Sequence, residues 1–129
     1  MSRDPPTLLL VDDEARILSS LRRSLRREGW RVLTAGTPAE ALRLLDEEPI
    51  DAVLSDHKMP GMSGLEVLEA AARRRPDAAR ILISGWPDEI PAGRLEALGI
   101  LALVPKPWDD AELKRILRAA LRTHGNRPP

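Results

Sequence analysis

Short apolar runs alternate with longer amphipathic segments along this chain, and this alternation restricts its fold more than any other feature. The runs lie at 7–11, 32–35, 52–55, 80–84 and 101–104. Three of them read Leu-Leu-Leu-Val, Ala-Val-Leu-Ser and Ile-Leu-Ile-Ser, which is typical of parallel strands covered on both faces. The pattern therefore predicts an α/β fold with five parallel strands joined by helices.

The segments between the runs carry the marks of helices. Within 17–25 the apolar residues share one helical face, and arginines occupy the opposite face. Three later helices are predicted to begin at a capping residue that is followed three positions later by Glu, namely Thr37, Ser63 and Asp109.

Length and composition narrow the classes of protein that remain. A length of 129 residues fits one domain over 1–129, with an ordered core at about 7–123. The 20 Lys and Arg balance the 20 Asp and Glu, which argues against binding to nucleic acid or an anionic membrane. The absence of Cys excludes disulfides, thiol nucleophiles and Cys-ligated zinc. With a polar start at 1–6 and no apolar run near the ~20 residues of a membrane span, we predict a cytoplasmic protein.

Acidic residues stand where two of the predicted strands end. Asp12 and Asp13 follow the first run, and Asp56 follows the third. Because parallel strands end at the same edge of a sheet, the three carboxylates should converge there. Uncompensated carboxylates repel one another, so the arrangement suits a hard divalent cation, for which Mg²⁺ is the natural candidate.

A hydroxyl and an ammonium group are predicted at the same edge. Ser84 ends the fourth run, and Lys106 follows the fifth. With a metal ion they suit a phosphoryl group, for which Asp56 would be the nucleophile that forms an aspartyl phosphate. Taken singly, each residue also fits a structural role as a helix cap, a turn residue or a solvated charge. Their joint appearance at the ends of four of the five predicted strands favours the phosphoryl site.

Four stretches together resemble the receiver domain of bacterial two-component response regulators. They are Val11-Asp12-Asp13-Glu14, the run from Ser55 to Gly64, Ile83-Ser84-Gly85 and Lys106-Pro107-Trp108-Asp109. The resemblance covers 7–122 and implies a doubly wound, flavodoxin-like (βα)5 sandwich with a parallel sheet in the order 2-1-3-4-5.

The resemblance also implies a role for each residue of the site. Asp56 would be the phosphoacceptor, and Asp12, Asp13, Asp56 and the backbone carbonyl of Lys58 would hold Mg²⁺. Ser84 would be the switch hydroxyl, Lys106 would pair with the phosphate, and Lys106–Pro107 would be a cis peptide. The phosphoryl donor would be a histidine kinase or a histidine phosphotransfer protein. The chain would be either a single-domain regulator with an unidentified output partner or the receiver of a longer protein.

Two features depart from the pattern of the family. Leu103 stands where receivers usually carry the Tyr or Phe that moves inward on activation. Pro87, Pro91 and Gly93 crowd the front of the fourth helical segment, which leaves at most about two turns. We therefore expect the face over 86–100 to be unusually mobile or remodelled.

Two residues are predicted to overhang the phosphorylation site. Trp86 lies two positions after Ser84, and Lys58 lies two positions after Asp56. The resemblance implies that these positions tune the self-hydrolysis of the phosphoryl group, and we predict that Trp86 shields it. Packing of Trp86 on the short helix is the alternative.

Three functions fit these observations to different degrees. The first is a phosphoacceptor switch, which catalyses its own phosphorylation and dephosphorylation but is not a turnover enzyme. The second is a receiver-fold binding module that works without phosphorylation, which Leu103 and the weak fourth helix favour. The third is a Mg²⁺-dependent phosphatase that works through an aspartyl phosphate, but such enzymes usually carry Asp-x-Asp after the first strand, whereas Asp12 and Asp13 are adjacent.

Overall fold

The computed structural model describes residues 5–125, which form five strands, five α-helices and one short 3₁₀ helix. The strands are β1 (Thr7–Val11), β2 (Arg31–Ala35), β3 (Ala52–Asp56), β4 (Ala79–Ser84) and β5 (Ile100–Pro105). The helices are α1 (Ala15–Arg26), α2 (Pro38–Glu47), α3 (Gly64–Arg74), the 3₁₀ helix η1 (Pro87–Glu89), α4 (Ala92–Ala97) and α5 (Asp110–Gly125). Each predicted strand is present, with bounds that agree to within one residue. The outer parts of the predicted domain, 1–4 and 126–129, lie outside the described residues.

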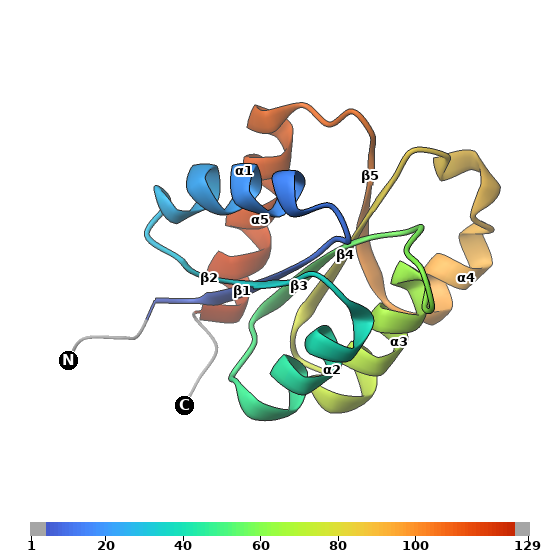
Figure 1. Ribbon diagram of the computed structural model, residues 1–129, viewed down its shortest axis with the longest axis horizontal. Helices are drawn as coiled ribbons and strands as arrows, with labels where there is room; N and C mark the ends of the chain where they lie inside the picture. The colour runs from blue at the N-terminus through green and yellow to red at the C-terminus, as the bar shows by residue number, and fades with distance from the viewer. Residues whose placement is uncertain (1–4, 126–129) are drawn as a thin grey trace.

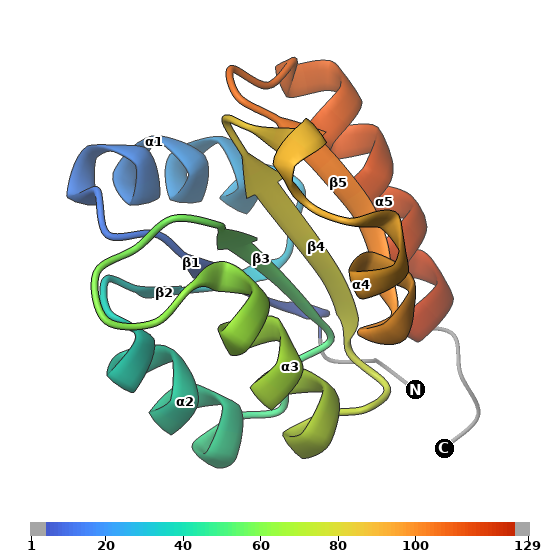
Figure 2. The ribbon, with the colours of Figure 1, turned by 90° about the vertical axis from the view of Figure 1, so that its right-hand side faces the viewer.

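The strands form one parallel sheet in the order β2-β1-β3-β4-β5, which confirms the predicted topology. Helices α1 and α5 cover one face of the sheet, and α2, α3 and α4 lie against the other (Figures 1 and 2). Side chains of β1 and β3 are buried along their whole length, as expected for central strands covered on both faces.

Helix starts follow the predicted caps. Thr37 accepts a hydrogen bond from the backbone N–H of Glu40, and Asp109 accepts one from that of Glu112. At α3 the capping box is complete, because Ser63 and Glu66 each bind the other's backbone N–H. The fourth segment is as short as predicted, since it contains only the three residues of η1 and the six of α4.

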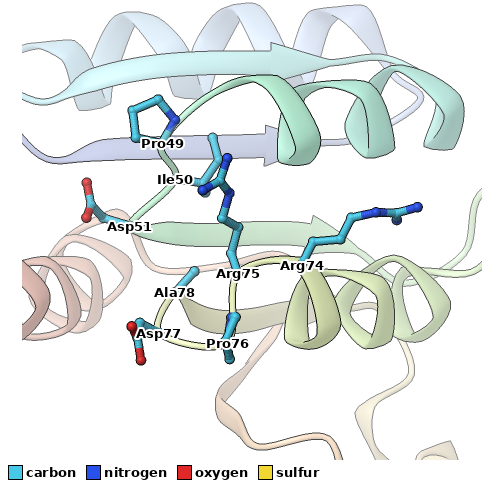
Figure 3. Close-up of a pocket in the computed structure, with 8 residues that line it drawn as sticks. All are labelled: Pro49, Ile50, Asp51, Arg74, Arg75, Pro76, Asp77 and Ala78. Carbon is cyan, nitrogen blue, oxygen red and sulfur yellow. The ribbon is translucent and has the colours of Figure 1, made fainter.

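A small cavity of about 180 Å³ lies at the amino end of the sheet, between the loops that precede β3 and β4 (Figure 3). The polar side chains around it are engaged in hydrogen bonds and ion pairs that connect neighbouring segments of the fold. Arg75 reaches toward Ile50 in Figure 3, and its Nε donates to the carbonyl of Leu45 at 2.8 Å. Arg74 forms an ion pair with Asp46 at 2.9 Å, and Asp51 accepts a hydrogen bond from the backbone N–H of Thr7. The functional residues predicted from the sequence lie at the opposite end of the strands.

Within residues 5–125, no helix is both long enough and apolar enough to cross a membrane.

Candidate functional site

The carboxylates of Asp12, Asp13 and Asp56 meet at the carboxyl edge of the sheet, as predicted. Val11 pairs with Ser55 in the register of β1 and β3, so the residues that follow them are neighbours. One carboxylate oxygen from each Asp lies within 4.8 Å of the others. Asp12 and Asp56 are buried, whereas Asp13 is exposed. The site therefore has two fixed acidic groups and one that opens to solvent.

The carboxyl of Asp12 has a raised pKa. Burial raises the pKa of its carboxyl to about 6, and the negative charge of Asp56 adds to this effect. A hydrogen bond from the backbone N–H of Glu14, at 2.9 Å, opposes the shift without reversing it. The raised pKa shows that the buried charge of Asp12 is only partly compensated by the protein's own groups.

Lys106 supplies the cation of the site. Its Nζ lies 2.9 Å from Oδ1 of Asp56 and 3.9 Å from Oδ2 of Asp12. Burial alone would lower the pKa of the Lys106 ammonium, but the hydrogen bond to Asp56 and the charges of Asp56 and Asp12 outweigh it and raise the pKa. The bond from Lys106 to Pro107 is cis, as the family resemblance implied. Lys106 therefore stays charged and points into the acidic group.

Ser84 ends β4 beside this group, and it is almost fully buried at 1% exposure. Its carbonyl accepts a hydrogen bond from the backbone N–H of Lys106 at 2.9 Å, which ties the ends of β4 and β5 together. Its Oγ accepts a hydrogen bond from the backbone N–H of Trp86 at 3.0 Å. The hydroxyl is thus held by the loop that leads into η1.

The start of α3 packs directly against Asp56. The backbone N–H of Gly64 donates to the carbonyl of His57 at 2.7 Å. A β-carbon at Gly64 would overlap the carbonyl oxygen of Asp56. The sequence placed Gly64 in the stretch from Ser55 to Gly64 that resembles receivers, but it did not predict that a side chain at this position would clash with Asp56.

An open cavity of about 420 Å³ lies over these groups, and Asp13, Asp56, Ser84 and Lys106 line it. Lys58 and Trp86 line it as well, so the structure brings both predicted overhanging residues to the site. The Nζ of Lys58 lies 4.1 Å from the centre of the Trp86 ring and 3.5 Å from Oε2 of Glu89. Sequence reasoning missed Glu89, because no local pattern links it to Lys58 across 31 positions.

Leu103 does not reach the cavity. It is partly buried and packs against the core cluster on the α2 and α3 face of the sheet. The position that carries a movable ring in most receivers is thus occupied here by an aliphatic core residue.

The donor set suits a hard divalent cation. Three carboxylates offer converging oxygen atoms, and the raised pKa of Asp12 marks a negative charge that a cation would stabilise. Lys106 and Ser84 border the same cavity, where they can neutralise and bind oxygen atoms of an anionic group. The arrangement can therefore bind a divalent cation together with a phosphoryl group.

Comparison with known proteins agrees with this chemistry. Residues 8–118 match the model of the response regulator receiver domain. The hydrogenase transcriptional regulatory protein HoxA of Cupriavidus necator is 42% identical over 127 residues, which cover 97% of this chain and 26% of HoxA. The transcriptional regulatory protein KdpE of Mycobacterium tuberculosis is 39% identical over 117 residues, which cover 89% of this chain and 50% of KdpE. The chain thus spans about a quarter to a half of the length of these relatives.

Solved structures give the same result. The signal receiver domain of an HD domain-containing protein from Pseudomonas fluorescens superposes with a TM-score of 0.87 at 33% identity, covering 96% of this chain and 92% of that one. The response regulator TrrA of Thermotoga maritima, solved in complex with Mg²⁺ and BeF, has a TM-score of 0.79 at 32% identity, covering 90% of this chain and 99% of that one.

Proposed function

The chain belongs to the response regulator receiver family, and from this premise we propose that it is a phosphoacceptor switch whose Asp56 receives a phosphoryl group. The observation that carries the proposal is the contact of 2.9 Å between Lys106 and Asp56 inside a group of three converging carboxylates. A structural ion pair would not require two further acids beside it.

Asp12, Asp13, Asp56 and the backbone carbonyl of Lys58 are the groups that would hold Mg²⁺ in this proposal. The ion would neutralise the carboxylates and the oxygen atoms of the phosphoryl group. The presence of Mg²⁺ and BeF in the TrrA structure supports this choice.

The transfer itself needs few groups from the chain. A carboxylate oxygen of Asp56 attacks the phosphorus atom of a phosphohistidine, and the bond from phosphorus to nitrogen breaks. The electron pair of that bond stays on the histidine, which takes a proton from water and leaves as a neutral imidazole. Lys106 stabilises the charge on the phosphoryl oxygens, and Ser84 donates its hydroxyl proton to one of them. For this donation the O–H bond of Ser84 must point into the cavity. The Ser84 oxygen can still accept the hydrogen bond from the backbone N–H of Trp86, because a hydroxyl donates one hydrogen bond and accepts others.

In this proposal the protein is a substrate of a phosphorelay and not a turnover enzyme. The donor is a histidine kinase or a histidine phosphotransfer protein, and the phosphorylated form changes its affinity for an output partner or domain. A cytoplasmic location forms part of the proposal, because such donors obtain their phosphoryl group from ATP.

Intact mass after incubation with Mg²⁺ and acetyl phosphate tests this function, with Asp56→Asn as the control. We expect one phosphoryl adduct that requires Mg²⁺ and is absent from the variant. If no adduct forms under conditions in which a control receiver is phosphorylated, the phosphorylation-independent binding module becomes the better interpretation. The aliphatic Leu103, in place of the usual movable ring, would then support that interpretation.

A further inference from the structure

Three side chains form a bridge at the wall of the cavity over Asp56, which Lys58 and Trp86 line. Lys58 belongs to the loop after β3, Trp86 to the loop after β4, and Glu89 to η1. The Lys58 ammonium lies 4.1 Å from the centre of the Trp86 ring and 3.5 Å from the Glu89 carboxylate. The bridge therefore joins two loops that leave different strands of the sheet.

The bridge holds a second cation, the Lys58 ammonium, at the wall of the cavity and away from Asp56. Lys106 already contacts Asp56 at 2.9 Å, whereas the two partners of Lys58 both lie in 86–89. Lys58 nevertheless lines the same cavity as Asp56, Ser84 and Lys106. A flexible lysine side chain at this wall can turn toward Glu89 or toward a new anion above Asp56.

The contacts of the bridge are individually weak. The side chains of Lys58 and Glu89 are 57% and 59% exposed, and ion pairs of this kind contribute little because water screens them. The Trp86 ring is also more than half exposed, so its attraction for the ammonium is not strengthened by burial. A phosphoryl group at Asp56 would add negative charge near Lys58 and compete directly with Glu89.

We propose that Glu89 is a positioning residue, which holds Lys58 against Trp86 until phosphorylation of Asp56 draws the Lys58 ammonium inward and releases η1. The proposal rests on the phosphoacceptor function proposed above. It makes the Lys58–Glu89 ion pair the element that carries the signal from the site to 86–98.

The segment that would be released is anchored mainly beyond η1. Ile90, the residue after η1, is buried in the core cluster on the α2 and α3 face of the sheet. The far end of the segment is tied to the sheet by Arg80, whose Nε donates to the carbonyl of Leu98 at 2.9 Å and whose Nη1 donates to the carbonyl of Ala78 at 3.0 Å. Its near end, at η1, carries Glu89. Figure 2 shows this segment, with α4, lying in front of β4 and β5. Loss of the Lys58–Glu89 pair would free η1 itself, while Ile90 and Arg80 retain the rest of the segment.

Substitutions at two adjacent exposed acids, Glu89 and Asp88, distinguish the effect of losing the Lys58–Glu89 ion pair from the effect of losing any negative charge on η1. Glu89→Gln removes the charge that binds Lys58 and keeps the size of the side chain. Asp88→Asn removes the same charge one position earlier, on the same turn, and serves as the matched control. Glu89→Asp restores the carboxylate and tests for rescue.

The experiment measures hydrogen exchange of the 87–98 amides in each protein, with and without Mg²⁺ and beryllofluoride as the phosphoryl mimic. In the parent protein and in Asp88→Asn, we expect the mimic to accelerate exchange about two- to fivefold, the range that loss of one exposed ion pair allows. In Glu89→Gln, exchange should already be fast without the mimic and change little on its addition. Glu89→Asp should restore part of the response, and amides of α3 should not respond in any protein.

Intact mass with Mg²⁺ and acetyl phosphate distinguishes failure of this proposal from failure of the proposed function. If all variants take up the phosphoryl group and Glu89→Gln exchanges and responds like Asp88→Asn, the positioning role of Glu89 is wrong and the phosphoacceptor function stands. If the parent protein takes up no phosphoryl group, both proposals are overturned.

Discussion

The two sides of the Asp56 cavity differ sharply in how much of their structure is buried. On the β3–α3 side, residues 56–74, helix α3 has eleven residues, a complete capping box and five buried positions. On the β4–α4 side, residues 85–98, helix α4 has six residues and none of them is buried, so that Ile90 is the one buried residue of this range. Both sides follow a central strand and line the same cavity.

The difference separates two tasks of a phosphoacceptor site. In the proposed function, Asp56 must be held in one position relative to the other proposed metal ligands, and the β3–α3 side provides this by burial and close packing. A switch also needs an element whose position can change at small energetic cost, and such elements make few buried contacts. We therefore expect substitutions on the β3–α3 side to act mainly on stability and those on the β4–α4 side to act mainly on the phosphorylated state.

The largest expected difference concerns one leucine on each side. Leu68 of α3 is fully buried, whereas Leu95 of α4 is only partly buried against the same core cluster. Leu68→Ala should lower the free energy of unfolding by about 2–5 kcal/mol, because it leaves a cavity in a packed core. Leu95→Ala should lower it by about 1 kcal/mol. Urea unfolding of both variants measures this, and equal losses would remove the distinction between the two sides.

The same substitution at two glycines should change stability in opposite directions. A β-carbon at Gly64 would overlap the carbonyl oxygen of Asp56, whereas one at Gly93 of α4 would meet no atom within 4 Å. Gly64→Ala should cost about 1–3 kcal/mol and reduce the proposed phosphorylation, because α3 must move away from Asp56. Gly93→Ala should stabilise the protein by up to about 1 kcal/mol through helix propensity. Thermal unfolding and intact mass test both effects, and a neutral Gly64→Ala would show that α3 is not tightly docked.

Asp12→Asn should stabilise the protein in the absence of metal. Burial raises the pKa of Asp12 from its ordinary 3.8 to about 6. Between pH 3.8 and about 6, the Asp12 carboxyl holds its proton more tightly in the folded protein than in the unfolded chain. The free energy of unfolding therefore falls as the pH rises through this range, and above it the buried charge of Asp12 destabilises the protein to its full extent. Removing the charge should therefore add about 1–3 kcal/mol at pH 7.5 and almost nothing at pH 3.5.

Unfolding at the two pH values, with and without Mg²⁺, checks this prediction. Mg²⁺ should stabilise the parent protein more than Asp12→Asn, because the variant lacks one of the proposed ligands. A variant that is less stable than the parent at pH 7.5 without Mg²⁺ would contradict the prediction.

The smallest effect on stability is expected on the exposed side of the cavity. The Trp86 ring is 56% exposed, so Trp86→Ala should change the free energy of unfolding by less than about 1 kcal/mol. If the ring shields the phosphoryl group from water, the same variant should lose the group severalfold faster. The lifetime of the adduct, followed by mass after removal of the donor, measures this, and an unchanged lifetime would leave Trp86 as a packing residue.

Much of this molecule could be predicted from local patterns. The apolar runs identified all five strands, and the Ser63–Glu66 pair identified the start of α3, because burial on both faces and helix capping depend on neighbours in the chain. The proline-rich start of the fourth segment predicted a short helix for the same reason. The convergence of Asp12, Asp13 and Asp56 followed from the rule that parallel strands end at one edge.

The sequence by itself therefore determined the order of the elements, the family and the residues that gather at the carboxyl edge of the sheet. Only the tertiary structure decided that Lys106 contacts Asp56 directly, how close α3 approaches Asp56, and that Lys58 pairs with Glu89. The reason is physical. Strands and helix caps depend on interactions between residues a few positions apart in the chain. These contacts instead join segments that become neighbours only when the sheet is complete, and no repeating sequence pattern predicts them.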